Sequence, residues 1–91
     1  MDYEWDGAKS EWNALARGLP FDLAVLLLRG PVIETIDDRV DYGEVRVRVI
    51  GRVAGETLHC VYTDRDGVRR IISLRYASRK ERNEYRATFG L

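Results

Sequence analysis

A group of seven basic side chains near the C-terminal end is the part of the sequence best suited to chemistry. Its members are Arg69, Arg70, Arg75, Arg79, Lys80, Arg82 and Arg86. An arginine guanidinium binds two phosphate oxygens at once, so this group predicts a phosphate-binding surface. Residues 65–91 hold eight basic and three acidic side chains, whereas residues 1–44 hold four basic and ten acidic ones. The cations could equally pair with carboxylates on a solvated surface, where each pair contributes only about 0–1 kcal/mol.

Other candidate groups stand alone in the sequence. Arg46 and Arg48 alternate with valines, so they either extend the basic surface across a sheet or protect an edge strand by their charge. His59 could act as a general base, because the ordinary pKa of its ring is about 6.5. Its position within a predicted strand favours a structural role instead. Tyr85 lies one helical turn beyond Arg82, where a phenol could orient a phosphate or transfer a proton.

Several classes of site are excluded. One cysteine, Cys60, and one histidine, His59, are too few for a structural zinc site or an internal disulfide. The acidic stretch 37–44 is typical of a solvated turn, and the chain has no P-loop, dinucleotide-binding fingerprint or Ser-His-Asp pattern. No segment reaches the roughly 18 consecutive apolar residues of a spanning helix, and no signal peptide is visible. We therefore expect a cytoplasmic protein without metal, cofactor or membrane partner.

Length and hydrophobic periodicity predict one domain that spans residues 1–91. Compact domains usually hold about 100–150 residues, and a hydrophobic content of 45% can fill one small core. Apolar spacing of about 3.6 residues predicts a helix over 7–17, capped by Asp6 and ended by Gly18. A second helix is predicted to open at Pro20. Both helices carry an apolar face.

The C-terminal helix and the tryptophans follow from local patterns. Ser78 and Glu81 have the spacing of a capping box, which predicts a final helix over residues 79–88. Trp5 and Trp12 could stack on nucleobases, but each lies on an apolar pattern, so core packing is predicted for both.

From residue 32 onward the apolar period changes from about 3.6 to two, which predicts a sheet. Three strands form an antiparallel meander, and the last two are joined by the hairpin signal Asp66–Gly67. The predicted strands cover residues 3–5, 32–36, 45–53, 57–63 and 68–73. The expected fold class is α+β, in the order β-α-α-β-β-β-β-α, with an antiparallel sheet packed by helices.

One geometric condition limits any shared site on the last strand. Strict alternation places Arg70 on the opposite face of the sheet from Ser73 and Arg75. A site that uses both arginines therefore requires a bulge or a strand end between them.

The order and spacing of several segments resemble the BrnT family, the toxin half of a bacterial type II toxin–antitoxin pair, over nearly the whole chain. The first marks are Trp5–Asp6 with Lys9 and Asn13, Gly18 with Phe21 and Ala24, Asp38–Arg39 with Gly43–Glu44 and Arg46, Ile50–Gly51–Arg52, and Val61–Tyr62–Thr63. The strongest marks are Arg70–Ile71–Ile72–Ser73, Arg75, Ala77, Glu81–Arg82 and Tyr85.

The resemblance implies a RelE-like fold and metal-independent cleavage of RNA that inhibits translation and growth. It also implies neutralisation by a BrnA-like antitoxin with a ribbon-helix-helix domain, through which the pair contacts operator DNA. The implied catalytic residues are Arg75, Arg82, Tyr85 and Glu81. The implied RNA-binding residues are Arg46, Arg70, Arg79 and Lys80. Glu81 ranks below the arginines because it also serves the capping box.

One departure from the family pattern supports an alternative. The family commonly has Lys-His before the glycine that ends the first helix, and here the pair is Ala16–Arg17. Loss of a proton-transferring histidine would remove a factor of about 10²–10⁴ in rate. The alternative is a catalytically inactive BrnT-like protein that acts as an antitoxin-binding co-repressor.

Overall fold

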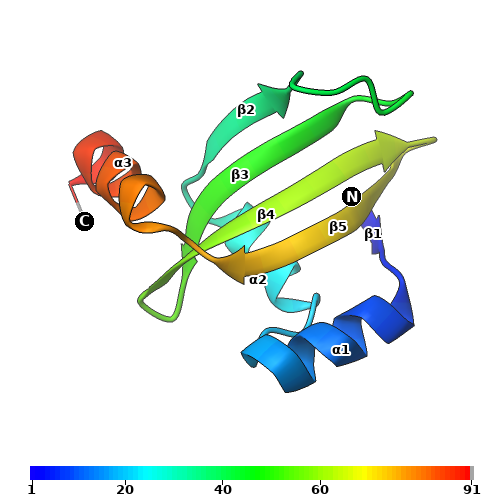
Figure 1. The fold of residues 1–91 in the computed structure, drawn as a ribbon, viewed down its shortest axis with the longest axis horizontal. Coiled ribbons are helices and arrows are strands. Elements are labelled where there is room, and N and C mark those ends of the chain that lie inside the picture. Colours follow the sequence, from blue (N-terminus) through cyan, green and yellow to red (C-terminus); the bar gives the residue numbers. More distant parts are fainter. Residues whose placement is uncertain (91) are drawn as a thin grey trace.

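The computed structural model describes residues 1–90 of the 91 and has three helices around one sheet (Figure 1). In chain order the elements are β1 (Asp2–Glu4), α1 (Gly7–Arg17), α2 (Leu23–Arg29), β2 (Ile33–Asp37), β3 (Arg46–Val53), β4 (Glu56–Arg65), β5 (Val68–Tyr76) and α3 (Arg79–Phe89). The predicted α+β class is confirmed, and the elements follow one another in the predicted sequence order. Within the described residues, no helix combines the length and apolarity needed to cross a membrane.

Local capping signals set the ends of α1 and α3. The Asp6 carboxylate accepts hydrogen bonds from the backbone N–H groups of Ala8 and Lys9, and α1 ends where Gly18 takes a left-handed conformation with φ of 72°. Both hydrogen bonds of the capping box at Ser78 are formed. The helices at 7–17 and from residue 79 onward are therefore confirmed. The second helix instead starts at Leu23, because Pro20, predicted to open it, belongs to a preceding turn.

The five strands form one mixed sheet in the order β1-β5-β4-β3-β2. The predicted meander is present as antiparallel β3, β4 and β5, and β2 also pairs antiparallel with β3. The prediction of an antiparallel sheet throughout is wrong at one edge, where β1 runs parallel to β5. No hairpin joins β1 to β5, so no short turn forces these two strands to run in opposite directions.

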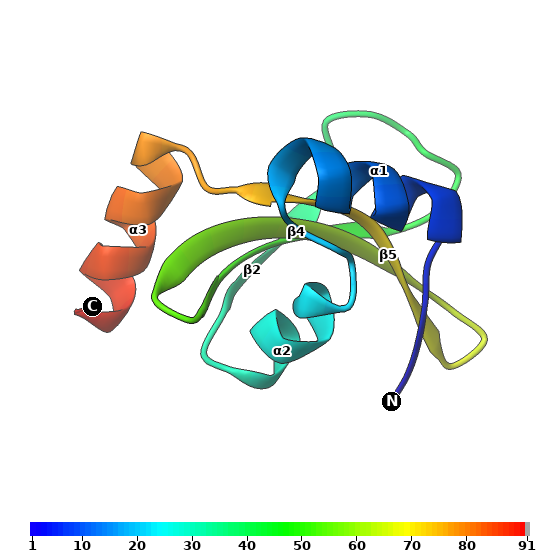
Figure 2. The same ribbon diagram turned by 90° about the horizontal axis from the view of Figure 1, so that it is seen from below.

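The core lies on one face of the sheet, beneath α2 (Figure 2). Ala24 and Leu27 of α2 are fully buried and pack against the apolar side chains of the sheet. The sheet contributes Val49, Leu58, Cys60, Tyr62, Ile71 and Leu74 to this core. Gly51 lets α2 approach closely, because a Cβ atom there would lie 2.8 Å from Leu27 Cγ. The main core therefore takes its side chains from one face of the sheet only.

Helix α1 lies beside β5 and supplies hydrogen-bond donors to its edge. Lys9 Nζ donates to the Ile72 carbonyl, and both Asn13 Nδ2 and Arg17 Nη1 donate to the Leu74 carbonyl. These bonds lie beyond the region of β5 that pairs with β1. The predicted burial of Trp12 is wrong, because this residue is 59% exposed and the Arg17 guanidinium lies over its ring.

Candidate functional site

A bulge in β5 brings its arginines to one side of the sheet. Val61 pairs with Ser73, but the next residue of β4, Tyr62, pairs with Ile71, so Ile72 is an extra residue. An extra residue reverses the alternation of faces. As a result Arg70 and Arg75 point to the same face, which satisfies the geometric condition that strict alternation would have broken.

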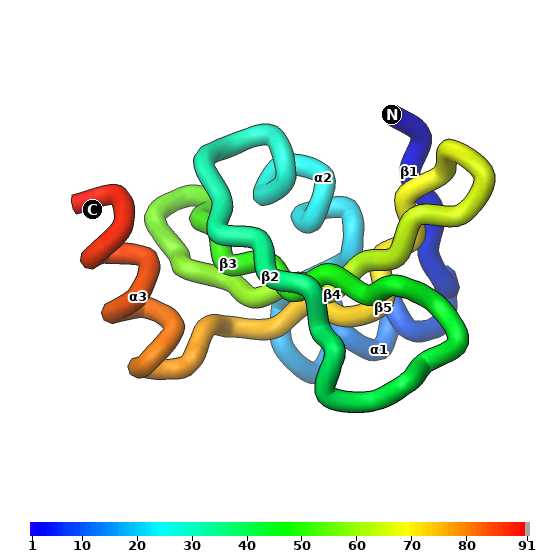
Figure 3. The backbone as a smooth tube through the Cα atoms, turned by 90° about the horizontal axis from the view of Figure 1, so that it is seen from above, coloured from blue at the N-terminus to red at the C-terminus, as the bar shows by residue number. Residues whose placement is uncertain are grey.

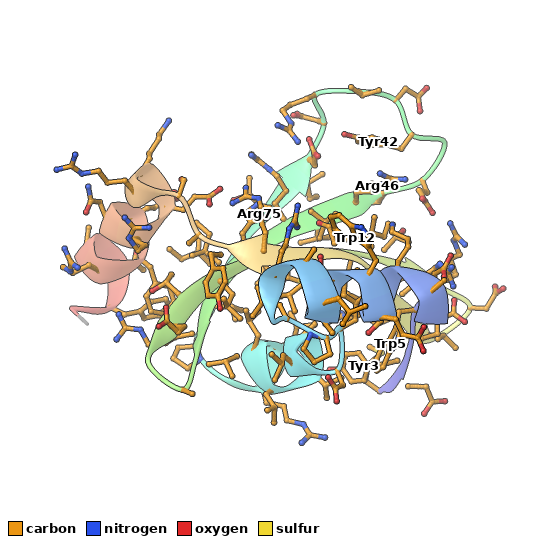
Figure 4. The ribbon with its side chains drawn as sticks, turned by 60° about the horizontal axis from the view of Figure 1, so that its bottom comes forward. Tyr3, Trp5, Trp12, Tyr42, Arg46 and Arg75 are labelled. Carbon is orange, nitrogen blue, oxygen red and sulfur yellow. The ribbon has the colours of Figure 1, made fainter. Side chains whose placement is uncertain are left out.

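The face of the sheet opposite α2 is polar, and we call it the open face. Paired residues of antiparallel strands point to the same side, so the strand register assigns its members. They include Thr35, Arg46, Arg48, His59, Thr63, Arg70, Ser73 and Arg75. Helix α3 stands at one end of this face, while α1 and the loop after β2 flank the other end (Figure 3). Figure 4 shows Arg75 and Arg46 on this side of the sheet, with Tyr42 on the flanking loop.

A cavity of about 280 Å³ lies between the open face and the start of α3. The sheet contributes Ile33, Thr35, Arg48, Ile50 and His59 to its lining, and the helix region contributes Ser78, Lys80, Glu81 and Glu84. Arginine, lysine and imidazole side chains thus meet two carboxylates in one hollow. Such a set can bind an anion and also move a proton.

Glu81 is the central side chain of this cavity. Its two oxygens accept hydrogen bonds from Arg75 Nη1 and Nη2 at 2.7 and 2.9 Å, and Oε1 also accepts from the Ser78 N–H at 2.8 Å. The Arg75 guanidinium holds the pKa of the Glu81 carboxyl at about 2, even though burial opposes this. Glu81 therefore stays ionised near neutral pH and cannot donate a proton there.

His59 lies on β4, the middle strand of the meander, and faces Glu81 of α3. The residue is 5% exposed, and Nε2 of its ring lies 3.7 Å from Glu81 Oε2. Nδ1 is buried and has no hydrogen-bond partner among residues 1–90. Burial lowers the pKa of the imidazole, and the nearby Arg75 charge lowers it further. The ring is therefore neutral near pH 7 and can accept a proton.

Two cations that line the cavity, Arg48 and Lys80, can bind an anion. Within the described part of the chain Arg48 forms no ion pair, and its Nε is buried without a hydrogen-bond partner. Lys80, on the first turn of α3, lines the same cavity and is exposed. These two cations have hydrogen-bonding capacity to offer to an anion.

The far end of the open face forms a second hollow of about 260 Å³. Arg46 and Arg70 both line it, and each has a loose carboxylate partner. The distance is 3.4 Å from Arg46 Nε to Glu44 Oε1 and 3.5 Å from Arg70 Nη1 to Glu4 Oε1. Partly exposed pairs at such distances are weak, so an incoming phosphate can compete for both guanidinium groups.

Two of the predicted catalytic residues lie apart from the cavity. Tyr85 is 1% exposed, and its hydroxyl donates to the Pro31 carbonyl at 2.9 Å. Arg82 is exposed and donates to the Ala77 carbonyl, and it does not line the cavity. The structure thus brings Arg75 and Glu81 together but separates them from Tyr85 and Arg82. Arg79 is also exposed on α3.

His59 and Arg48 both line the cavity, although neither is among the catalytic or RNA-binding residues that the family resemblance implies. The sequence favours a structural role for His59 because no catalytic partner is near it along the chain. Its partners are supplied by β5 and α3, in the form of Arg75 and Glu81. For Arg48, the alternation of arginine with valine in β3 indicates that it shares one face of the strand with Arg46.

Comparison with known proteins adds a family to this geometry. A family model described as the ribonuclease toxin BrnT of a type II toxin–antitoxin system matches residues 5–81. No curated protein matches the chain. The matched range includes His59, Arg75 and Glu81 and ends before Arg82 and Tyr85.

Proposed function

The chain belongs to the BrnT family of type II toxin–antitoxin ribonuclease toxins, and from this premise we propose that it cleaves RNA bound along the open face. The observation that carries the proposal is the convergence of four arginines on that face. Arg46, Arg48, Arg70 and Arg75 come from two strands and share one side only because of the bulge at Ile72. A row of guanidinium groups suits the repeated phosphates of a nucleic acid backbone.

The spacing of the cations fits a single strand of RNA. Residues two apart on a strand are separated by about 6.6 Å, so Arg46 and Arg48 can contact successive positions along a backbone. The two hollows extend the same row from α3 to α1. The exposed cations of α3, which are Arg79, Lys80 and Arg82, lie at its margin and are proposed to bind flanking phosphates.

The proposed reaction is metal-independent cleavage, in which side chains stabilise the charge that develops on phosphorus. Arg48 lines the cavity, and Arg75 is hydrogen-bonded to Glu81, which lines it as well. One well-placed donor to a developing oxyanion contributes about 3–4 kcal/mol. Arg75 must share its guanidinium between Glu81 and the phosphate. It can do so because a guanidinium has five N–H donors, of which Glu81 uses two. Tyr85 has no place in this reaction, since its hydroxyl is buried and engaged.

The family also supplies the proposed partner and architecture. We propose a RelE-like arrangement of the α+β fold and an antitoxin of the BrnA kind, whose ribbon-helix-helix domain makes all contacts with operator DNA. A segment of the antitoxin that covers the open face would neutralise the toxin by competing with RNA. Because the proposed substrate is cytoplasmic RNA, the protein is placed in the cytoplasm.

Induction of the chain alone in bacterial cells tests the proposal. We expect growth arrest and loss of RNA, both prevented by co-induction of the antitoxin. Arg48→Ala and Arg75→Ala proteins should stay folded, as judged by circular dichroism, and should lose most of the effect. Arg29→Ala is a matched control, because Arg29 is exposed on α2, across the sheet from the open face. Arrest and RNA loss that are equal in the parent and both open-face variants would refute the proposed site.

Two observations favour the alternative of an inactive co-repressor. The bidentate bond to Glu81 uses two N–H donors of Arg75, an arginine that the reaction needs. Position 17 holds an arginine that is bonded to the Leu74 carbonyl. A co-repressor would bind antitoxin tightly without arresting growth when it is induced alone. The induction experiment therefore separates the two functions.

A further inference from the structure

We propose that His59 takes the proton from the attacking 2′-hydroxyl of RNA while Glu81 positions its imidazole, an inference that rests on the proposed ribonuclease function. The ring lies on β4 opposite Arg75 of β5 and Ile50 of β3. It lines the same cavity as Arg48. A phosphate held by Arg48 and Arg75 would thus place the neighbouring ribose beside the imidazole.

The hydrogen bonding of His59 is incomplete in a way that points to a ligand. Buried polar atoms in folded proteins almost always have a partner, yet Nδ1 of this side chain, which is 7% exposed, has none among residues 1–90. The other nitrogen, Nε2, faces Glu81 at 3.7 Å. This distance is too long for a hydrogen bond, so neither ring nitrogen is engaged by the described residues, and a hydroxyl in the adjoining cavity would supply a missing bond.

Glu81 is held firmly enough to orient a base. Arg75 and the Ser78 N–H fix both of its oxygens, so the carboxylate cannot rotate away from His59. A reacting hydroxyl, a base and a third group that orients the base form the usual arrangement for activating a nucleophile. Glu81 is therefore a positioning residue, and its negative charge also stabilises the imidazolium that forms.

The charges around His59 favour a neutral ring before reaction. Arg75 on β5, Arg48 on β3 and Arg39 on the loop after β2 all lower its pKa, in addition to burial, while Glu81 on α3 raises it. Lys80 and Glu84 face the same cavity from α3. The net direction is downward, so the ring is unprotonated at pH 7 and competent as a base.

The proposed attack of the 2′-hydroxyl on phosphorus needs no co-reactant other than water. The 2′-oxygen bonds to phosphorus as its proton moves to His59, and the bond from phosphorus to the 5′-oxygen breaks. The 5′-oxygen leaves with a proton from water, and His59 later returns its proton to solvent. The products are a 2′,3′-cyclic phosphate and a 5′-hydroxyl end.

The first test measures cleavage of a fluorescent, mixed-sequence single-stranded RNA from pH 5 to 9. The parent rate should rise with pH and level off above the pKa of His59. His59→Gln should lose about 10²–10⁴-fold in kcat and lose this pH dependence, with binding of a 2′-O-methyl version of the RNA unchanged within about threefold. Cys60→Ala is a matched control, because Cys60 is the next residue of β4 and faces the core. A His59→Gln protein that cleaves at the parent rate, or keeps the pH profile, would overturn the role of His59.

The second test needs no variant. His59 is the single histidine of the chain, so its ring resonances are identified without assignment. Titration with the 2′-O-methyl RNA should shift these resonances in the parent and move the midpoint of their pH titration. Unchanged ring resonances in the presence of bound RNA would overturn the inference but not the nuclease proposal. A parent protein that cleaves none of the RNA would overturn the proposed function itself, and the role of His59 with it.

Discussion

Arg75 and Glu81 join the end of β5 to the first turn of α3 through two parallel hydrogen bonds of 2.7 and 2.9 Å. The same carboxylate completes the capping box with Ser78 and faces the imidazole of His59. One side chain therefore fixes the start of the helix, the direction of an arginine and the environment of a candidate base. The position of α3 relative to the open face depends on this carboxylate being charged.

Glu81→Gln should reveal that dependence in the response of stability to acid. Because Arg75 lowers the pKa of Glu81 from 4.5 to about 2, the stabilisation by its charge is complete above pH 4.5 and is lost as the pH falls toward 2. At pH 7 the variant should lose about 1–2 kcal/mol from the weakened cap and ion pair. Urea unfolding at pH 7, 4 and 3 should show a difference in unfolding free energy between parent and variant that becomes smaller as the pH falls.

Glu84→Gln is the control for that experiment, since Glu84 is exposed one turn further along α3. Its effect on the free energy of unfolding should stay near zero at each pH. A Glu81→Gln difference that is the same at pH 7 and pH 3 would contradict the assigned role of the charge.

The parts of the fold that sequence predicted best are those with local causes. Asp6, Gly18 and Ser78 act on backbone groups within a few residues, so they indicate helix ends without knowledge of the fold. The parallel pairing of β1 with β5 could not be predicted in this way, because it joins strands at opposite ends of the chain. The exposure of Trp12 likewise depends on which face of α1 the sheet covers.

The site was harder to predict because it depends on one irregularity. The tight turn at Asp66–Gly67, with φ of 51° and 80°, pairs Arg65 with Val68 and sets the register of the hairpin. In unbroken register His59 would face Leu74, but the bulge moves Arg75 opposite it. The alternation of residues 68–76 indicates neither the presence of the bulge nor its place, so the proximity of His59 to Arg75 and Glu81 was not visible in the sequence.

Tyr85→Phe should separate a structural role for this residue from a catalytic one. Removal of the hydroxyl breaks its part-buried hydrogen bond to the Pro31 carbonyl, which should cost about 0.5–1.5 kcal/mol of unfolding free energy. The rate of RNA cleavage by the folded protein should change less than about twofold. A variant with parent stability but a rate reduced a hundredfold would restore Tyr85 to the reaction.

Gly51→Ala tests the contact between the sheet and α2. The new Cβ would lie 2.8 Å from Leu27 Cγ and 3.1 Å from Val32 Cγ1, which is closer than packed atoms tolerate. We expect a loss of about 1–3 kcal/mol in thermal or urea unfolding. In a Leu27→Ala background, which is itself destabilised, the further loss caused by Gly51→Ala should be smaller, because the Leu27 atoms that clash are gone. Additive losses in the double variant would show that the helix moves away and that the clash is not local.

Arg48→Gln tests whether Arg48, the arginine that lines the cavity, binds a phosphate. Each phosphate neutralised on a single strand contributes about 0.7 to the slope of log affinity against log salt concentration. Fluorescence anisotropy with the 2′-O-methyl RNA, from 50 to 300 mM KCl, should therefore give a slope that is smaller by about 0.7 for this variant. Arg29→Gln removes the same charge from α2, on the other side of the sheet, and should leave the slope of the parent. Equal slopes for the two variants would show that net charge, and not a contact at Arg48, governs binding.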